Sequence, residues 1–299
     1  MPSPPFQQPQ ADLYIPNGEK YERALRRTTH LCIATHADDI EFIAYHGIAA
    51  CFNREDQSFS GVVLTDGVGS ARAGPYANFS DAALREARAR EQRAAAQLGQ
   101  YAAVAQLAWP SSQVKAGLNE TVVNELGWIL EQMRPETLYL HNPFDRHPTH
   151  LAVLQHCLEA LRRDAPRHLP AQIYGCEGWR DLDWLPRSAR IELDVSERPH
   201  LANALNGVFD SQIAGGKRYD RAIRGRRQAN ATLAQSHSTD AHEAVTLAVD
   251  LKPLLEPPAV TLEAFTAGYL DAFREEVLDG LRALEAPSQS STRPSEAAD

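Results

Sequence analysis

The sequence predicts an α/β fold, a Rossmann-like, doubly wound and mostly parallel sheet with helices on both faces and further elements added at the C-terminal end. Two observations lead to this prediction. Short apolar runs alternate with segments in which apolar residues recur at helical spacing, which is typical of strand–helix–strand units. The 299 residues, of which 43% are hydrophobic, are also enough to bury one large core without any internal repeat.

Five apolar runs are expected to be strands, and they cover residues 31–35, 60–65, 104–107, 137–140 and 173–176. Between and after these runs, the helical spacing of apolar residues predicts helices over residues 40–48, 82–98, 118–133 and 151–161. Beyond Trp179 the pattern changes to loops containing proline and tryptophan. Two more helices are expected there, a charged one over residues 217–234 and a final one over residues 262–273.

The chain divides into four segments by composition. Residues 1–22 are polar and rich in proline and residues 285–299 have the composition of a solvated segment, so both are predicted to be flexible tails. Residues 23–180 are predicted to form the Rossmann-like core. Residues 181–284 are predicted to pack on this core and to complete the substrate site, either as a small lobe or as elements laid over the sheet.

Charge and hydropathy argue against several classes of protein. A net charge of -9 gives no reason to expect a nucleic-acid partner. No apolar run approaches the roughly 20 residues of a membrane helix, and the N-terminus lacks the features of a signal peptide, so a cytoplasmic location is predicted. The four cysteines, at positions 32, 51, 157 and 176, form no Cys-x-x-Cys pair and are interpreted as small core residues.

Two polar motifs each follow a predicted strand. His-Ala-Asp-Asp covers residues 36–39, and Asp-Arg-His-Pro-Thr-His covers residues 145–150. Because ligands of open α/β sheets bind outside the carboxyl ends of the strands, both motifs are expected in one crevice. Two imidazoles and one carboxylate that leave a coordination position open are the ligands of a hydrolytic zinc site. His36, Asp39 and His150 are therefore the predicted metal ligands.

Asp38 and His147 are the predicted catalytic residues. Asp38 lies next to a ligand without being needed as one, so it can remove a proton from the attacking water as a general base. His147 can carry a proton and stabilise the oxyanion that forms when an acyl carbon becomes tetrahedral. Each motif alone also has a structural explanation, because Asp38 with Glu41 is a capping box and His147-Pro148 is an ordinary helix start. Two matched motifs at one edge of the sheet favour the metal site.

These motifs resemble the signatures of the PIG-L/LmbE family of zinc-dependent de-N-acetylases, His-Pro-Asp-Asp-Glu and Asp-x-His-x-Asp-His. The resemblance extends over residues 28–179 and includes Thr65-Asp66-Gly67, Arg88-x-x-Glu91 and His141-Asn142-Pro143; residues 177–180 and 210–212 also look like one branch of the family. It implies a hydrolase that removes the N-acetyl group of an N-acetylglucosamine-type sugar or glycoconjugate. It also implies the same ligands for Zn²⁺, the same base and an electrophilic His147. Fe²⁺, Co²⁺ or Mn²⁺ could use these ligands too.

Further residues are candidates for contacts with the substrate: Asp66, Arg88, Glu177, Trp179 and Arg180. They follow predicted strands or lie on a neighbouring helix, and Trp179 could stack on a pyranose ring. For Trp179 ordinary packing is slightly favoured, and for the other four a solvated surface or ordinary packing is about as good an explanation. The basic cluster over residues 217–227 could receive an anionic group of the substrate, although a solvated helix face is the favoured interpretation.

Two other classes of function are open at this stage. Ala37, Thr149 and Phe209 stand where the family commonly has Pro, Asp and His, which suggests a non-catalytic, metal-binding carbohydrate-recognition protein that retains the deacetylase fold. A nucleotide-binding Rossmann protein is disfavoured, because the first strand-to-helix turn has no glycine fingerprint and places two negative charges where a pyrophosphate would lie. The sequence leaves the exact substrate undetermined and a homo-oligomer open.

Overall fold

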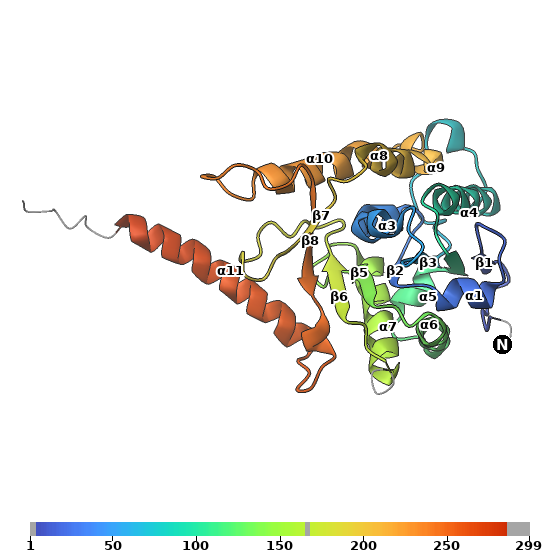
Figure 1. Cartoon of the computed structure of the whole chain (residues 1–299), viewed down its shortest axis with the longest axis horizontal. Helices are drawn as coiled ribbons and strands as arrows, with labels where there is room; N and C mark the ends of the chain where they lie inside the picture. The colour runs from blue at the N-terminus through green and yellow to red at the C-terminus, as the bar shows by residue number, and fades with distance from the viewer. Residues whose placement is uncertain (1–3, 165–167, 286–299) are drawn as a thin grey trace, which may run out of the picture.

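The structure, a computed structural model, describes residues 4–164 and 168–285. An eight-stranded sheet lies at its centre, with helices on both faces (Figure 1). The strands are β1 (Asp12–Tyr14), β2 (His30–Ala34), β3 (Phe59–Thr65), β4 (Ala103–Trp109), β5 (Thr137–His141), β6 (Gln172–Cys176), β7 (Ile191–Asp194) and β8 (Val245–Asp250). Their order across the sheet is β1-β4-β3-β2-β5-β6-β8-β7.

The centre of the sheet is parallel and its edges are antiparallel. Strands β4, β3, β2, β5 and β6 run parallel to one another, whereas β1 pairs antiparallel with β4, β8 with β6, and β7 with β8. The α/β class and all five expected strands are thus confirmed. Because β3 and β4 lie on one side of β2 while β5 and β6 lie on the other, the winding reverses between β2 and β5. Doubly wound sheets bind their ligands at such a reversal.

The helices cover both faces of the sheet. They are α1 (Tyr21–Arg26), α2 (Asp39–Ile43), α3 (Tyr45–Cys51), α4 (Asp81–Leu98), α5 (Ser111–Lys115), α6 (Glu120–Met133), α7 (Pro148–Asp164), α8 (Pro199–Gly207), α9 (Asp210–Ile213), α10 (Tyr219–Thr232) and α11 (Leu262–Glu285). Helices α3 and α4 lie on one face with α8, α9 and α10 beyond them, and α5, α6 and α7 lie on the other (Figure 1). The expected helix over residues 40–48 is divided at Ala44, and α11 is longer than predicted.

Alternation along β2 explains why its residues form a central strand. Leu31 and Ile33 are fully buried in one apolar cluster with residues of α6 and α7, while Cys32 and Ala34 are fully buried in a second cluster with residues of α2 and α3. Successive side chains of a strand point to opposite faces, so a strand covered on both sides needs an uninterrupted apolar run. The rigid centre of the sheet then holds the turns that follow β2 and β5.

The edge strands were not predicted. Residues 12–14, expected in a flexible tail, form β1. Asp12 of this strand forms an ion pair with Arg93 at 2.7 Å. A strand of three residues is too short to give a readable pattern in the sequence. Strands β7 and β8 extend the sheet on the other side, and α10 packs against β8. Residues 1–3 and 286–299 of the expected tails lie outside the described residues.

The four cysteines are buried and free, which confirms their interpretation as core residues. None of the helices in the described parts of the chain combines the length and the apolar character that crossing a membrane requires.

Candidate metal centre and adjoining pocket

The turn from β2 into α2 brings His36, Asp38 and Asp39 to the carboxyl edge of the sheet. Asp38 has a φ of 92°, a left-handed conformation that costs a non-glycine residue on the order of 1 kcal/mol and is often found at functional sites. Asp39 is the first residue of α2, and its Oδ2 atom accepts the backbone N–H of His36 at 2.8 Å. The same oxygen lies 3.1 Å from His36 Nδ1. The strained turn therefore holds both ends of the first motif in one place.

The connection from β5 to α7 supplies His147 and His150, and Asp145 orients them. Asp145 Oδ1 accepts the backbone N–H of His147 at 3.0 Å. Asp145 Oδ2 lies 3.1 Å from His150 Nδ1 and accepts the backbone N–H of Trp179 at 3.1 Å. A carboxylate on one ring nitrogen of a histidine fixes the ring and turns the other nitrogen outward, as in many metal sites. His150 Nε2 is consequently directed at the first motif.

Three donor atoms from the two motifs form a nearly equilateral triangle. His36 Nδ1 and Asp39 Oδ2 are 3.1 Å apart, His150 Nε2 and Asp39 Oδ2 are 3.4 Å apart, and His150 Nε2 and His36 Nδ1 are 3.3 Å apart. Donors that surround zinc tetrahedrally at about 2.0–2.1 Å lie roughly 3.3 Å from one another. The separations in this protein fit that geometry, and the donor set of two imidazoles and one carboxylate suits a divalent cation.

Two other triads overlap this triangle. His36 with His147 and His150, and Asp39 with His141 and His150, also bring their donor atoms within 4.8 Å of one another. His141 is fully buried, and its Nε2 atom already faces the backbone nitrogen and hydroxyl of Thr35 at 3.1 and 2.9 Å. Of the ligands that differ between this triad and the triangle, His36 lines the pocket described below and His141 does not, so the triangle is the arrangement nearer to the pocket.

The charges of the cluster support one another. Burial would raise the pKa of Asp39, but His150 and His36 outweigh burial and hold that pKa well below its usual range. Burial would lower the pKa of His150, but the carboxylates of Asp39 and Asp145 outweigh burial and raise it to about 9. Without a metal ion, the cluster is therefore held together by a proton on His150 between two carboxylates.

The pKa values of Asp38 and His147 are shifted in the opposite directions to those of Asp39 and His150. Asp38 is almost completely buried, and burial together with the Asp39 carboxylate raises its pKa well above the usual value, against the attraction of Arg88. Its Oδ2 atom has no hydrogen-bond partner among the described residues. Burial and the neighbouring His150 and His36 lower the pKa of His147 to about 4, so this imidazole is neutral near pH 7. The backbone N–H of Thr149 points at His147 Nδ1 at 3.3 Å, which leaves the proton on Nε2.

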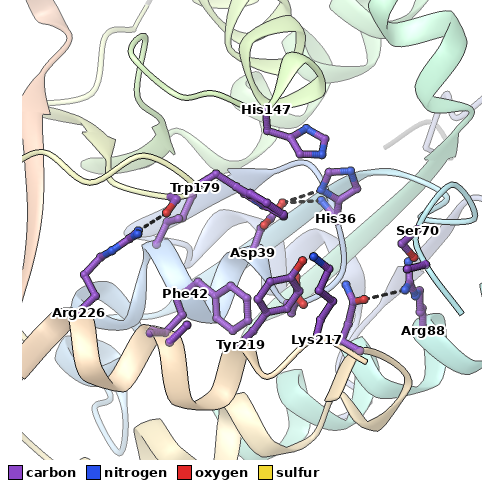
Figure 2. A pocket seen from close by; sticks show the side chains of 17 residues that line it. His36, Asp39, Phe42, Ser70, Arg88, His147, Trp179, Lys217, Tyr219 and Arg226 are labelled. Atoms are coloured by element: carbon purple, nitrogen blue, oxygen red, sulfur yellow. Dashed lines mark hydrogen bonds and ion pairs between the residues drawn. The ribbon is translucent and has the colours of Figure 1, made fainter. Parts of the chain in front are cut away.

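The cluster opens into a pocket with a volume of about 350 Å³, within the usual range for small-ligand sites. His36, Asp38, Asp39 and His147 line one part of it, and Figure 2 shows His36 and His147 on the side opposite Phe42 and Tyr219. The pocket thus joins the two predicted catalytic residues to His36 and Asp39, two of the three candidate metal ligands.

The five predicted substrate residues divide into two groups. Arg88 and Trp179 line the pocket. Arg88 is buried, donates to Gly67 O and, at 2.8 Å, to Gln212 Oε1, so it lies inside the site rather than on a solvated face. The backbone at Trp179 can approach Asp145 because the preceding residue is Gly178, where a Cβ atom would lie 2.7 Å from Asp145 Oδ2.

Asp66, Glu177 and Arg180 do not line the pocket. Asp66 pairs with Arg85 at 3.2 Å. Glu177 is buried and accepts the side chain of Asn230 at 2.5 Å and the backbone N–H of Leu247 at 3.0 Å. Arg180 donates to Phe144 O at 2.6 Å. These side chains hold the loops of the rim in place and are not themselves positioned to contact a ligand there.

The basic cluster over residues 217–227 is only partly the solvated face that the sequence favoured: Arg218, Arg221 and Arg224 are exposed, whereas other members have contacts inside the protein. Arg227 is buried, donates to Glu41 O at 2.8 Å and to Phe42 O at 3.0 Å, and thereby attaches α10 to α2. Lys217 and Arg226 line the pocket. The sequence carried a usable signal, because Tyr219, Ala222, Ile223 and Arg226 recur at helical spacing and form one face of α10.

Other pocket residues were assigned no role from the sequence: Phe42, Ile43, Ser70, Ala71, Gln212, Tyr219, Ala222 and Ile223. Most of them come from α2, from the loop after β3 and from α10, which are far apart in the chain. Residues 210–212 had been noted for resemblance alone, and Gln212 proves to be the partner of Arg88.

Fold and site together define an α/β protein with a histidine–aspartate cluster, able to hold a divalent cation, at the winding reversal of its sheet. Residues 31–161 match the model of the PIG-L family, described as GlcNAc-PI de-N-acetylase, and the chain therefore carries a PIG-L domain over this range. A search of the curated proteins finds no match.

Solved structures with the same fold include a conserved protein of Thermus thermophilus (19% identity, TM-score 0.59, covering 78% of this chain and 99% of that one). They also include a 4-carboxy-2-hydroxymuconate hydratase of Pseudomonas putida (16% identity, TM-score 0.58, covering 75% of this chain and 96% of that one). A third is the N,N'-diacetylchitobiose deacetylase of Pyrococcus horikoshii (16% identity, TM-score 0.57, covering 73% of this chain and 82% of that one). At these identities the likeness establishes the fold, and the functions named for these proteins differ.

Proposed function

We propose that this protein is a zinc-dependent hydrolase that removes the N-acetyl group from an N-acetylglucosamine-type sugar or glycoconjugate. The observation that carries the proposal is the triangle of His36, Asp39 and His150, of which His36 and Asp39 line a pocket together with Asp38 and His147. The PIG-L domain and the likeness to a diacetylchitobiose deacetylase support the reaction class.

In this proposal His36, Asp39 and His150 hold the cation, and Asp145 keeps the ring of His150 turned toward it. A bound Zn²⁺ would supply Lewis-acid polarisation and lower the pKa of water, which makes water a nucleophile near neutral pH. The three donor atoms already have the spacing that the cation needs, so binding requires the loss of the His150 proton but little movement of the side chains.

Asp38 acts as the general base. Its unpartnered Oδ2 atom and its raised pKa suit a carboxylate that takes a proton from the attacking water and returns it later in the reaction. The water oxygen bonds to the acyl carbon, the C–N bond breaks, and the proton held by Asp38 passes to the leaving nitrogen. The products are acetate and a free amine.

His147 acts on the oxygen of the acyl group. Its imidazole is neutral near pH 7, and the hydrogen on Nε2 can donate to the carbonyl oxygen as negative charge develops there. Asp145 accepts the backbone N–H of His147 but has no hydrogen bond to its ring. It therefore does not take the place of the Asp side chain that the family commonly has at the position of Thr149. His147 therefore works as a hydrogen-bond donor without net charge.

Acetate release from N-acetylglucosamine conjugates tests the proposal. The protein is assayed as purified, after chelation, and after zinc is returned. The proposal expects activity that chelation abolishes and zinc restores. Equal hydrolysis by the chelated protein would contradict the zinc mechanism, and zinc binding without hydrolysis of any conjugate would favour the non-catalytic binding protein.

A further inference from the structure

Beyond the catalytic groups, the pocket continues along a wall of aromatic rings. The ring of His147 lies 5.5 Å from that of Trp179, Trp179 lies 6.0 Å from Tyr219, and Tyr219 lies 5.7 Å from Phe42. Figure 2 shows Phe42 and Tyr219 side by side across the pocket from the histidines. This wall begins at a predicted catalytic residue and leads away from it.

The pocket has both polar and apolar lining residues. The polar ones include His36, Asp38, Asp39, Arg88 and Gln212, and the deacetylase proposal places the amide next to them. Phe42 and Ile43 of α2 and Ala222 and Ile223 of α10 also line the pocket, and none of these four offers a side-chain hydrogen bond. A sugar hydroxyl placed there would lose its hydrogen bonds to water without replacement, at a cost of about 1–3 kcal/mol each. An apolar group is the better occupant.

Lys217 adds a positive charge to this wall. Its ammonium nitrogen lies 5.4 Å from the centre of the Trp179 ring, and no carboxylate of residues 4–164 or 168–285 lies within ion-pair distance of it. Arg226, one turn beyond Ile223 on α10, lines the same pocket and donates to Gly178 O. Two cations next to an apolar surface suit a ligand that is both apolar and negatively charged.

We propose that the substrate of this protein is an N-acetylglucosamine conjugate whose non-sugar part is an apolar ring with an anionic group. The ring lies against Phe42, Tyr219 and Ile223, and the anion faces Lys217. The proposal rests on the deacetylase function above, and it names the class of aglycone that the described pocket selects.

Three related compounds separate the parts of the proposal. They are methyl, phenyl and 4-carboxyphenyl β-glycosides of N-acetylglucosamine, which share the sugar and differ only in the aglycone. Their dissociation constants are measured by calorimetry with metal-free protein, where no turnover interferes, and their kcat/KM values are measured with zinc-loaded protein. We expect the phenyl ring to tighten binding by roughly tenfold or more, because it buries apolar surface, and the carboxylate to tighten it further.

Two variants assign these gains to residues. Ile223→Asn should remove most of the gain from the phenyl ring, and Lys217→Gln should remove the gain from the carboxylate. Leu233, just past the end of α10, is exposed and lines none of the pocket, so Leu233→Asn makes a matched apolar-to-polar change that should leave both gains intact.

The outcomes distinguish the two proposals. Equal binding of all three glycosides, or gains that Ile223→Asn and Lys217→Gln leave unchanged, would overturn the aglycone proposal even if all three are hydrolysed. Graded binding that the variants abolish, without release of acetate from any compound, would support the aglycone subsite and overturn the deacetylase function.

Discussion

Zinc binding should compete with a proton on His150, and the structure gives the size of the effect. Without metal, the pKa of His150 is about 9, because the carboxylates of Asp39 and Asp145 outweigh the effect of burial. A ligand nitrogen must lose its proton before it can bind a metal ion. Each pH unit below 9 therefore weakens zinc binding about tenfold, which amounts to about 100-fold near pH 7. The pKa of Asp39 is already depressed, so this carboxylate adds no second proton there.

Calorimetric titration with zinc in two buffers of different ionisation enthalpy measures the protons released. We expect about one proton from His150 per zinc ion near pH 7, and a chelator competition corrected for the chelator's own protonation should show affinity rising with pH toward 9. Asp145→Asn removes one of the groups that raise the pKa of His150, so it should reduce the proton release. An affinity that does not change between pH 7 and 9 would refute the reasoning.

Three further predictions concern separate parts of the structure. Asp38→Asn should lower kcat for deacetylation by about 10²–10⁴-fold while zinc binding persists, as measured by acetate release and metal analysis; near-normal turnover would remove Asp38 from the mechanism. Folding raises the pKa of His150, so the protonated imidazole stabilises the metal-free protein. In thermal unfolding this contribution should be fully present below pH 6.5, the ordinary pKa of histidine, and should be lost as the pH rises through about 9. The zinc-loaded protein should not show this loss. Arg227→Met should lower the free energy of unfolding, measured by urea titration, by about 1–3 kcal/mol, because the carbonyls of Glu41 and Phe42 lose their hydrogen-bond donor. It should also raise KM, because α10 is no longer attached to α2. An unchanged KM would show that other contacts hold α10 in place.

The convergence of His36, Asp39 and His150 could be predicted from the sequence because these residues lie in two short motifs. His36 and Asp39 are three residues apart, His147 and His150 are also three apart, and each motif follows a strand whose apolar run is readable. Rules for parallel sheets then place both turns at one edge. The separations of the three donor atoms come only from the structure.

The far wall of the pocket could not be predicted in the same way. Tyr219 and Ile223 come to the site because Arg227 attaches α10 to α2, and that contact joins residues more than 180 positions apart. Glu177 and Arg180 are the converse case. Their positions just after a strand suggested contact with the substrate, but neither lines the pocket: Glu177 is buried and accepts from Asn230, and the exposed Arg180 donates to Phe144 O.

The most direct test of the metal site is the anomalous scattering of zinc in crystals of the protein. The proposed centre predicts one strong peak about 2 Å from His36 Nδ1, Asp39 Oδ2 and His150 Nε2, next to the pocket that His36 and Asp39 line. A peak between Asp39, His141 and His150, away from the pocket, would contradict the proposed centre, as would zinc bound only elsewhere on the protein.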